Sequence, residues 1–365
     1  MQIKEIICAL ENLAPRSLQE SYDNSGIQCG DTSQICKQAL VCLDCTETVV
    51  DEALETGCNL IIAHHPLIFG KGLSSITGKS WEERVLLKAL KNDIAIYAIH
   101  TNLDNVLHGV NQKIAGKLGL IDVKILAPKK DLLCKLVTFV PTSHAEQVRE
   151  AICQAGAGRI GEYSDCTFQT PGTGTFKALE KATPYSGSIG ELHRESEIRM
   201  ETIFPAYLEE KIVSALISNH PYEEVAYDVF SLKNKWAAVG SGIVGRFPEP
   251  MEETDFLNWT KKVMECNAIR HTQAIGRKIS KVAVCGGSGA FLLKNAMAQE
   301  ADAFVTADFK YHQFFDADKR ILVADIGHYE SEHFTIEQIK DVLNNNFPTF
   351  AVRLSKINTN PINYL

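Results

Sequence analysis

Short apolar runs that alternate with helix-like segments most constrain the fold of this chain, and they occur near both ends of it. Near-continuous apolar strands separated by helices are typical of a parallel sheet that is covered on both faces. The expected strands are residues 39–45, 59–63, 94–99, 281–285, 303–306 and 321–325. The expected helices are residues 48–56, 81–91, 290–299 and 330–344. We therefore expect an α/β fold with mixed or parallel sheets.

The middle of the chain has a different character. Residues 132–140 and 197–204 alternate like strands, and residues 145–155 and 206–219 have the period of amphipathic helices. The stretch 156–190 is rich in Gly, Thr, Ser and Pro, which predicts a long irregular excursion. This order is typical of a ferredoxin-like α+β module.

The domain organisation follows from that change of character. We predict an inserted α+β domain at residues 131–232, which splits one α/β unit into residues 1–130 and 233–365. The glycines and prolines of residues 234–250 predict a linker that leads back into the α/β unit.

Charge and cysteine content limit the partners and the compartment. The net charge of −8 and the lack of a dense Lys/Arg block argue against nucleic acid as the main partner. Residues 1–15 predict an amphipathic helix whose Lys4, Glu5 and Glu11 exclude a signal-peptide core. No apolar run approaches the ~20 residues that cross a membrane. Eleven cysteines without a secretion signal then predict free thiols and a cytoplasmic location.

One cysteine pair, Cys42 and Cys45, has CxxC spacing. A single pair supplies only half of a tetrahedral zinc set, and the sequence offers no second pair to complete it. We interpret these residues as buried strand thiols.

Three of the predicted strands end in residues that bind metals. These clusters are His64 with His65, His100 with Asp104, and His328 with Glu332. Ligands of open α/β sheets bind outside the carboxyl ends of the strands, so the clusters share a favoured edge. A lone histidine at a strand end more often caps or hydrogen-bonds, but three clusters at equivalent ends favour a metal site. The spacing of His328 and Glu332 also puts both on one helix face.

The kind and number of these candidates indicate the metals. Imidazole with carboxylate suits Zn, Fe, Mn, Co or Ni, and it excludes an all-oxygen calcium site. Three protein ligands and a water complete a catalytic zinc site. Six candidates therefore overfill one ion and suit two divalent cations that share a carboxylate. The sequence does not select the metal.

Three further motifs allow two interpretations each. Gly286–Gly289 follows a strand, and both an anion site and a tight packing turn remain open. Asp308, Tyr311 and His312 follow the strand 303–306, where they would act in the site or cap a helix. The turn 22–26 would either reach the same cleft or form only an Asx turn.

Several motifs together match those of a known family. They are Tyr22-Asp-Asn-Ser-Gly26, Ala63-His-His-Pro66, His100-Thr-Asn-Leu-Asp104, His220-Pro-Tyr-Glu-Glu224 with Tyr227-Asp228, Gly286-Gly-Ser-Gly289, and Gly327-His-Tyr-Glu-Ser-Glu332. In this order, over almost the whole chain, they resemble the GTP cyclohydrolase 1 type 2 homologue family, also called interacting-factor-3-like proteins. Tyr22 stands where many members have Trp.

The resemblance implies a site, an assembly and a kind of insert. It implies a two-metal centre whose ligands are His64, His65, Asp104, His328 and Glu332, with Glu332 bridging both ions. His100 then becomes a supporting or catalytic residue. The resemblance also implies a toroidal homohexamer and, in longer members, an insert similar to the PII signalling proteins. The segment 220–224 is interpreted as structural or regulatory.

The function implied is that of a metal-dependent hydrolase of the GTP cyclohydrolase type. A metal-bound hydroxide would open the imidazole ring of a purine and release formate, with His100 or His312 moving protons. The partner would be a small-molecule substrate, with a nucleotide as one option. Two alternatives remain open: a phosphoesterase or amidohydrolase acting on another small molecule, and a non-enzymatic metal-binding scaffold or metal chaperone.

Overall fold

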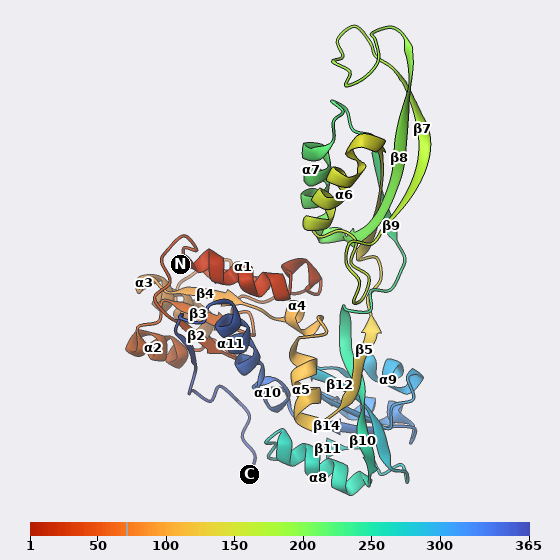
Figure 1. Ribbon diagram of the computed structural model, residues 1–365. Coiled ribbons are helices and arrows are strands. Elements are labelled where there is room, and N and C mark those ends of the chain that lie inside the picture. Colours follow the sequence, from red (N-terminus) through yellow and green to blue (C-terminus); the bar gives the residue numbers. More distant parts are fainter. Residues whose placement is uncertain (71) are drawn as a thin grey trace. The chain divides into compact units, whose positions relative to one another are not determined.

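The computed structural model describes residues 1–70 and 72–365 and is drawn in Figure 1. Its contacts divide the chain into two compact units. The first combines Met1–Ala127 with Ala238–Leu365, and the second is Pro128–Ala237. The insert predicted at residues 131–232 falls inside the second unit. The fold is mixed α/β, with parallel and antiparallel strand pairs.

The first unit contains a five-stranded sheet of order β1-β4-β3-β2-β15. Its strands are β1 (Gly26–Cys29), β2 (Ala39–Cys42), β3 (Leu60–Ala63), β4 (Ala95–Ala98) and β15 (Val352–Leu354). β15, β2, β3 and β4 run parallel, and β1 pairs antiparallel with β4. Every residue of β2, β3 and β4 is buried, as their continuous apolar sequence predicts for strands between two layers.

Helices cover this sheet. They are α1 (Ile3–Leu13), α2 (Glu47–Thr56), α3 (Trp81–Lys91) and α11 (Thr335–Asn346). α2 and α3 bury Val49 and Val85 against Leu40 and Ile61 of the sheet, whereas α11 packs against α1 and β2. α2 ends at Gly57, whose φ of 73° is a left-handed conformation that glycine adopts without steric cost.

A second sheet in the same unit has the order β11-β14-β13-β12-β10-β5. Its strands are β5 (Ile121–Pro128), β10 (Gly240–Met251), β11 (Arg270–His271), β12 (Ile279–Ser288), β13 (Ala303–Ala307) and β14 (Leu322–Asp325). β12, β13 and β14 are parallel. The helices of this part are α4 (Thr101–Asp104), α5 (Val110–Leu118), α8 (Glu253–Val263), α9 (Leu293–Ala298) and α10 (His328–Glu332).

The two halves of the first unit exchange strands. β5 comes from the first half of the sequence and joins the second sheet, whereas β15 comes from the end of the chain and joins the first sheet. This exchange ties the two sheets into one unit, so ligand clusters from both halves can meet.

The second unit is one four-stranded sheet with two helices on it (Figure 1). Its elements are β6 (Leu133–Pro141), α6 (Ala145–Gln154), β7 (Thr167–Lys177), β8 (Leu192–Pro205), α7 (Glu209–Asn219) and β9 (Tyr227–Leu232). Their β-α-β-β-α-β order and the strand order β7-β8-β6-β9 are those of a ferredoxin-like module. Leu136, Val140, Met200 and Phe204 bury one sheet face against α6 and α7.

Two sequence predictions in the middle of the chain are wrong. Residues 156–190 are not wholly irregular, because they contain β7, which pairs with β8 from Thr167↔Thr202 to Lys177↔Leu192. Its Pro171 and its glycines hide the strand in the sequence, and an edge strand tolerates both. The predicted linker 234–250 contains most of β10, a strand inside the second sheet.

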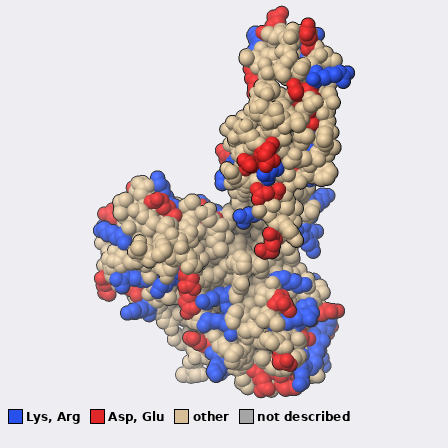
Figure 2. All heavy atoms as spheres, in the orientation of Figure 1, with Lys and Arg blue, Asp and Glu red and all other residues tan. Residues whose placement is uncertain are grey.

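A third difference lies near the end of the chain. The single helix expected at 330–344 is two helices, α10 and α11, with His333 and Phe334 between them. Other expectations agree with the structure. All eleven cysteines are free thiols; Cys42 is the last residue of β2, Cys45 follows it, and both lie in the core. On the face drawn in Figure 2, basic and acidic side chains are interspersed. Among the described residues, no helix is both long and apolar enough to span a bilayer.

Candidate metal centre

The ends of β3 and β4 position the first two clusters of the site. Ala63 is in register with Cys42 of β2 and Ala98 of β4, so the three parallel strands end at one level. His64 and His65 continue directly from β3, and their backbone amides donate to the carbonyls of Cys42 and Leu43. Past β4, the short helix α4 turns the chain so that Asp104 lies at its end.

The third cluster follows β14 of the other sheet. Gly327 precedes α10 with a φ of 94°, and a side chain there would meet the carboxylate of Glu330. The chain therefore turns sharply and begins α10 at His328. One helical turn later, Glu332 lies on the same helix face, as its spacing predicts.

These clusters meet at the carboxylate of Glu332. Its Oε2 lies 2.9 Å from His65 Nε2 and 3.0 Å from His328 Nε2. The same oxygen is 4.0 Å from His64 Nε2, which in turn is 3.6 Å from Asp104 Oδ1. Side chains from both sequence halves thus point their ligand atoms at one small volume.

Two atoms of the site are buried without a hydrogen-bond partner among the described residues. They are His64 Nε2 and Asp104 Oδ1. A buried polar atom without a partner lowers the stability of the folded protein by about 1–3 kcal/mol. Two such atoms, 3.6 Å apart, therefore require a bound group that compensates for both. A divalent cation bound to both atoms would supply that compensation. The donors present therefore fit a metal ion, and the two groups His64–His65–His100 and His65–His328–Glu332 each have ligand atoms close enough to hold one.

Each candidate histidine ligand is oriented through its other ring nitrogen. His64 Nδ1–H donates to the carbonyl of Ile99 at 2.8 Å. His65 Nδ1–H donates to Asp44 at 2.7 Å, and His328 Nδ1–H donates to Asp308 at 2.6 Å. These bonds fix each ring so that Nε2 faces the site, an arrangement that is usual for metal-bound histidine.

The electrostatics of the metal-free cluster depend on burial and on Glu332. Burial lowers the pKa of His64 to about 3, so its ring is neutral and ready to ligate. Burial opposes a charge on His65, but its bonds to Asp44 and Glu332 outweigh that effect and raise its pKa to about 10. The charge of Glu332 raises the pKa of His328 to about 11. A cation must therefore displace protons from His65 and His328 when it binds.

The two carboxylates respond in opposite directions. Burial, reinforced by the charge of Glu332, holds the pKa of Asp104 well above its ordinary value. Burial opposes ionisation of Glu332 too, but His328 and His65 overcome it and hold the pKa of Glu332 well below its ordinary value. Glu332 is thus the ionised carboxylate of the cluster, and a nearby cation would favour the ionised form of Asp104 as well.

The glycine turn after β12 is part of this centre. The amide of Gly286 donates to Asn111 at 2.9 Å, and that of Gly287 donates to Ser331 at 2.9 Å. Gly287 has a φ of 61°, and a side chain there would collide with Oε1 of Glu332. The turn packs against α10 and makes room for Glu332, so these two amides already have acceptors within the protein.

His100 lies beside the ligands. Its Nδ1–H donates to Asp23 at 2.8 Å, and its ring centroid is 5.3 Å from that of His64. The turn 22–26 therefore reaches the cleft through Asp23, which also accepts from the backbone amide of Thr101. Burial opposes ionisation of Asp23, but its bonds to His100 and Thr101 hold its pKa well below the ordinary value.

The structure does not bring His312 to this cluster. Its ring is exposed and lies 5.2 Å from the ring of Tyr311, and it is not among the residues that line the cavities at the centre. Asp308 does reach the centre through His328. A catalytic role for His312 stays a prediction.

Two cavities adjoin the centre and share His100, His328 and Phe69. The larger measures about 400 Å³, and it is lined further by His65, Pro66, Tyr329, Pro361 and Ile362. The smaller measures about 220 Å³ and includes Tyr22, Asp104 and Glu332. A small molecule in either cavity would contact the ligand cluster.

Sequence reasoning missed Asp44 and the last residues of the chain. Asp44 Oδ2 accepts from Thr359 at 2.7 Å, and Asn360 donates to Glu330 at 3.2 Å. Asp44 lies just past the end of β2, the same level as the other clusters, and that position was the available signal. The CxxC spacing around Asp44 indicates a role for the thiols and not for the carboxylate. Residues 359–362 carry no comparable signal.

Comparisons with known proteins cover the whole chain. The family described as Duf34/NIF3 (NGG1p interacting factor 3) matches residues 1–361. A Halalkalibacterium halodurans protein named GTP cyclohydrolase 1 type 2 homolog is 40% identical over 365 residues, which is 99% of this chain and 98% of that protein. A Bacillus subtilis protein of the same name is 40% identical over 368 residues, with the same coverage of each.

A solved structure is similar as well. It is a Bacillus cereus protein related to NIF3, with 39% identity and a TM-score of 0.87 over 100% of this chain and 99% of that one. The centre described above lies on residues that both sequence halves contribute, inside the matched range. The chain belongs to the Duf34/NIF3 family.

Proposed function

We propose that this protein is a hydrolase that depends on two divalent cations at the centre formed by His64, His65, Asp104, His328 and Glu332. The observation that carries the proposal is the pair His64 Nε2 and Asp104 Oδ1, which are buried, 3.6 Å apart and without a hydrogen-bond partner among the described residues. Neutral imidazole and carboxylate so placed have a cation as their natural common partner.

A count of two cations is supported by the distribution of ligand atoms around Glu332. His65 and His328 lie about equally near its Oε2, at 2.9 and 3.0 Å. His64 Nε2 is farther from the same oxygen, at 4.0 Å, and lies closer to Asp104 Oδ1, at 3.6 Å. Five ligands exceed the three protein ligands of a single catalytic zinc, and a carboxylate between two groups suits a bridge.

The residues around the centre have definable roles. Two bound cations would polarise a substrate oxygen and lower the pKa of a coordinated water to about 7. Asp23 holds Nδ1–H of His100, so that Nε2 of His100 is left to give or take a proton at the substrate. Phe69, whose ring centroid is 6.1 Å from that of His100, gives the cleft an apolar wall on that side.

We propose a purine nucleotide as the substrate class, with ring opening and release of formate as the reaction. The larger cavity supports a planar ring, because Phe69, Tyr329 and Pro361 give it flat apolar walls beside His65 and His328. The names of the curated relatives contain GTP cyclohydrolase, and this part of the proposal rests on that analogy.

We also propose that the second unit is a PII-like insert and that the protein assembles as a homohexamer. The β-α-β-β-α-β order of the insert supports the first point. The assembly rests on the family resemblance. Light scattering of the purified protein should give six times the chain mass of 40.4 kDa, and a monomer or dimer mass would refute the hexamer.

The test of function uses protein loaded separately with Zn, Mn, Fe, Co or Ni and incubated with GTP. Formate and a ring-opened nucleotide should appear together, and Glu332→Gln should abolish both. Glu337→Gln is the matched control, since Glu337 lies on α11, pairs with Lys113 and has a side chain that is 44% exposed. No formate with any metal would reject the cyclohydrolase reaction. Turnover of phosphoesters or cyclic amides instead would identify one of the other hydrolase classes.

A further inference from the structure

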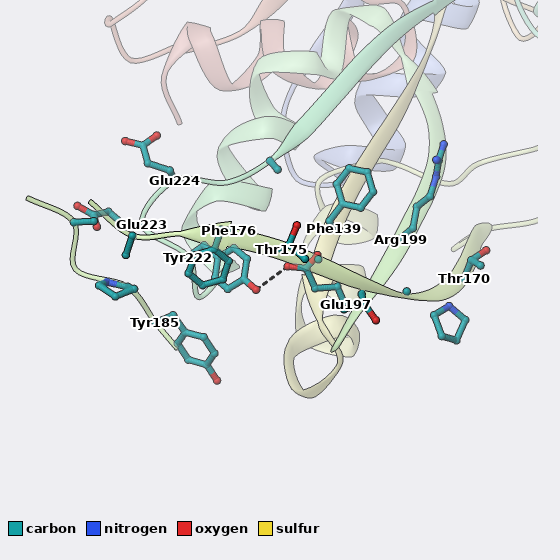
Figure 3. A pocket seen from close by; sticks show the side chains of 18 residues that line it. Phe139, Thr170, Thr175, Phe176, Tyr185, Glu197, Arg199, Tyr222, Glu223 and Glu224 are labelled. Carbon is teal, nitrogen blue, oxygen red and sulfur yellow. Dashed lines mark hydrogen bonds between the residues drawn. The ribbon is translucent and has the colours of Figure 1, made fainter. Parts of the chain in front are cut away.

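A third cavity, whose lining residues are far from the metal ligands in sequence, lies wholly within the second unit (Figure 3). It measures about 610 Å³, within the range of pockets that hold small molecules. Its aromatic lining residues are Phe139, Phe176, Tyr185 and Tyr222. The proposed hydrolase reaction makes no use of this cavity.

The cavity lies on the sheet face that the helices leave uncovered. Val140 and Met200 point into the core beneath α6 and α7. Because neighbouring strand residues face opposite sides, Phe139 on β6 and Arg199 on β8, which are in register, point away from the helices. Glu197, two residues before Arg199, lies on the same face. The loop residues Ala182 and Tyr185 complete the lining of the cavity.

A carboxylate lies buried in this lining. Glu197 is only 8% exposed, and Tyr222 donates its hydroxyl to Oε1 at 2.7 Å, the bond drawn in Figure 3. Among the described residues, no hydrogen bond reaches the other oxygen, Oε2. Gly174 on β7 leaves the room for it, since a side chain there would collide with that oxygen.

The motif 220–224 explains how Tyr222 is held. His220 Nε2–H donates to the carbonyl of Phe139 at 3.0 Å, and the backbone amide of Tyr222 donates to His220 Nδ1 at 3.1 Å. Burial and the bond to Glu197 both raise the pKa of Tyr222, so its hydroxyl stays protonated and donates. The motif therefore places a hydroxyl against a carboxylate at a cavity wall.

The charges of the lining favour a cation. Three glutamates line it, Glu197, Glu223 and Glu224, against the single basic residue Arg199. That guanidinium is paired with Glu201 at 2.9 Å, which reduces its effect on the cavity. An anionic ligand would meet a net negative wall, whereas a positive group gains from it.

The aromatic rings support the same class of ligand. The ring of Tyr222 lies 6.0 Å from that of Phe176 and 6.1 Å from that of Tyr185, with tilted or edge-on geometry. A cation near several ring faces is attracted by about 0.5–2 kcal/mol per contact once it is desolvated. Aromatic rings around a carboxylate are thus suited to an ammonium or guanidinium group.

We propose that the second unit binds a small organic cation in this cavity. The ligand carries an ammonium or guanidinium group that contacts Glu197 Oε2 and an apolar body that lies against Phe139, Phe176 and Tyr222. All residues that line this cavity belong to the second unit.

The test uses the full-length protein and three probes of one shape and different charge. Phenethylammonium is positive, 2-phenylethanol is neutral and phenylacetate is negative, and benzyltrimethylammonium serves as a second cation. Ligand-observed NMR and calorimetry measure their affinities. The cations should bind about 10-fold more tightly than the alcohol, and phenylacetate most weakly.

Three variants locate the binding. Glu197→Gln should weaken cation binding about 10-fold while leaving the alcohol unchanged. Gly174→Ala should weaken it as well, because it displaces the carboxylate without changing any charge. Glu210→Gln is the matched control, since Glu210 is an exposed residue of α7 on the helix side of the sheet. Thermal unfolding checks that each variant is folded.

Several results would overturn the proposal. One is phenylacetate binding as tightly as the cations. Another is the same affinity in folded Gly174→Ala as in the wild type. Failure of both cations to bind at millimolar concentration would also exclude this ligand class.

Discussion

Replacement of Asp44 by Asn tests whether the hydrogen bond behind His65 matters to the metal centre. Asp44 contacts no candidate cation position itself. Its Oδ1 accepts from His65 Nδ1 at 2.7 Å, and its side chain is 32% exposed. An amide oxygen can still accept that hydrogen bond, but it lacks the negative charge that makes the imidazole a stronger ligand.

The expected loss of metal affinity follows from the kind of hydrogen bond that changes. A hydrogen bond to a charged group contributes about 1.5–3 kcal/mol, and a neutral one about 0.5–1.5 kcal/mol. The difference of about 1–2 kcal/mol corresponds to roughly a 5- to 30-fold loss of metal affinity. Since solvent reaches part of Asp44, we expect the lower half of that range.

The assay is a chelator-competition titration with Zn, followed by elemental analysis after dialysis. Asp51→Asn is the control, because the same change is made in an exposed carboxylate that pairs with Lys88. Asp44→Asn should weaken metal binding while Asp51→Asn leaves it unchanged. Folded Asp44→Asn protein with wild-type affinity would refute the role assigned to this bond.

Three further predictions address other parts of the account. Gly287→Ala puts a side chain against Glu332 at a φ of 61° and should therefore reduce the metal content of the protein. Gly276→Ala, at a glycine of similar φ in open space, should change the metal content little. Equal metal content in both variants would refute the role of Gly287 in making room for Glu332. If the proposed hydrolase reaction occurs, His100→Gln should lower turnover about 100-fold or more and retain its metal content. His312→Gln, at an exposed residue, should leave turnover unchanged. The reverse pattern would assign the proton transfer to His312 and not to His100. Burial holds the pKa of His220 below its ordinary value, so the unfolded chain binds more protons than the folded chain as the pH falls below about 6.5. In urea unfolding, the insert should therefore be fully stable above that pH and lose stability below it. This loss should vanish in His220→Gln.

Much of the first unit could be predicted from its sequence because its signals are local. β3 is a continuous apolar run that ends at a histidine pair, and burial between two layers requires such a run. The spacing of His328 and Glu332 gives their common helix face directly. The general rule for α/β sheets places the carboxyl ends of β3 and β4 at one edge, but β14 lies in the second sheet, and that rule alone does not bring its end to the same cleft.

Other features depend on contacts that are distant in sequence. β7 has Pro171 and two glycines, and only its pairing with β8 makes it a strand. Thr359 reaches Asp44 across 315 positions, a contact that no local pattern announces. The sequence offers both His100 and His312 as proton carriers, yet of these two the fold brings only His100 beside the candidate ligands.

The central claim, that the centre holds two cations, is tested most directly by anomalous diffraction from crystals of the metal-loaded protein. Our account predicts two peaks about 3.5–4 Å apart, with Glu332 between them, His64 and Asp104 on one ion, and His65 and His328 nearer the other. In Glu332→Gln at least one peak should disappear. A single peak, or peaks that do not involve His64 and Asp104, would contradict the account.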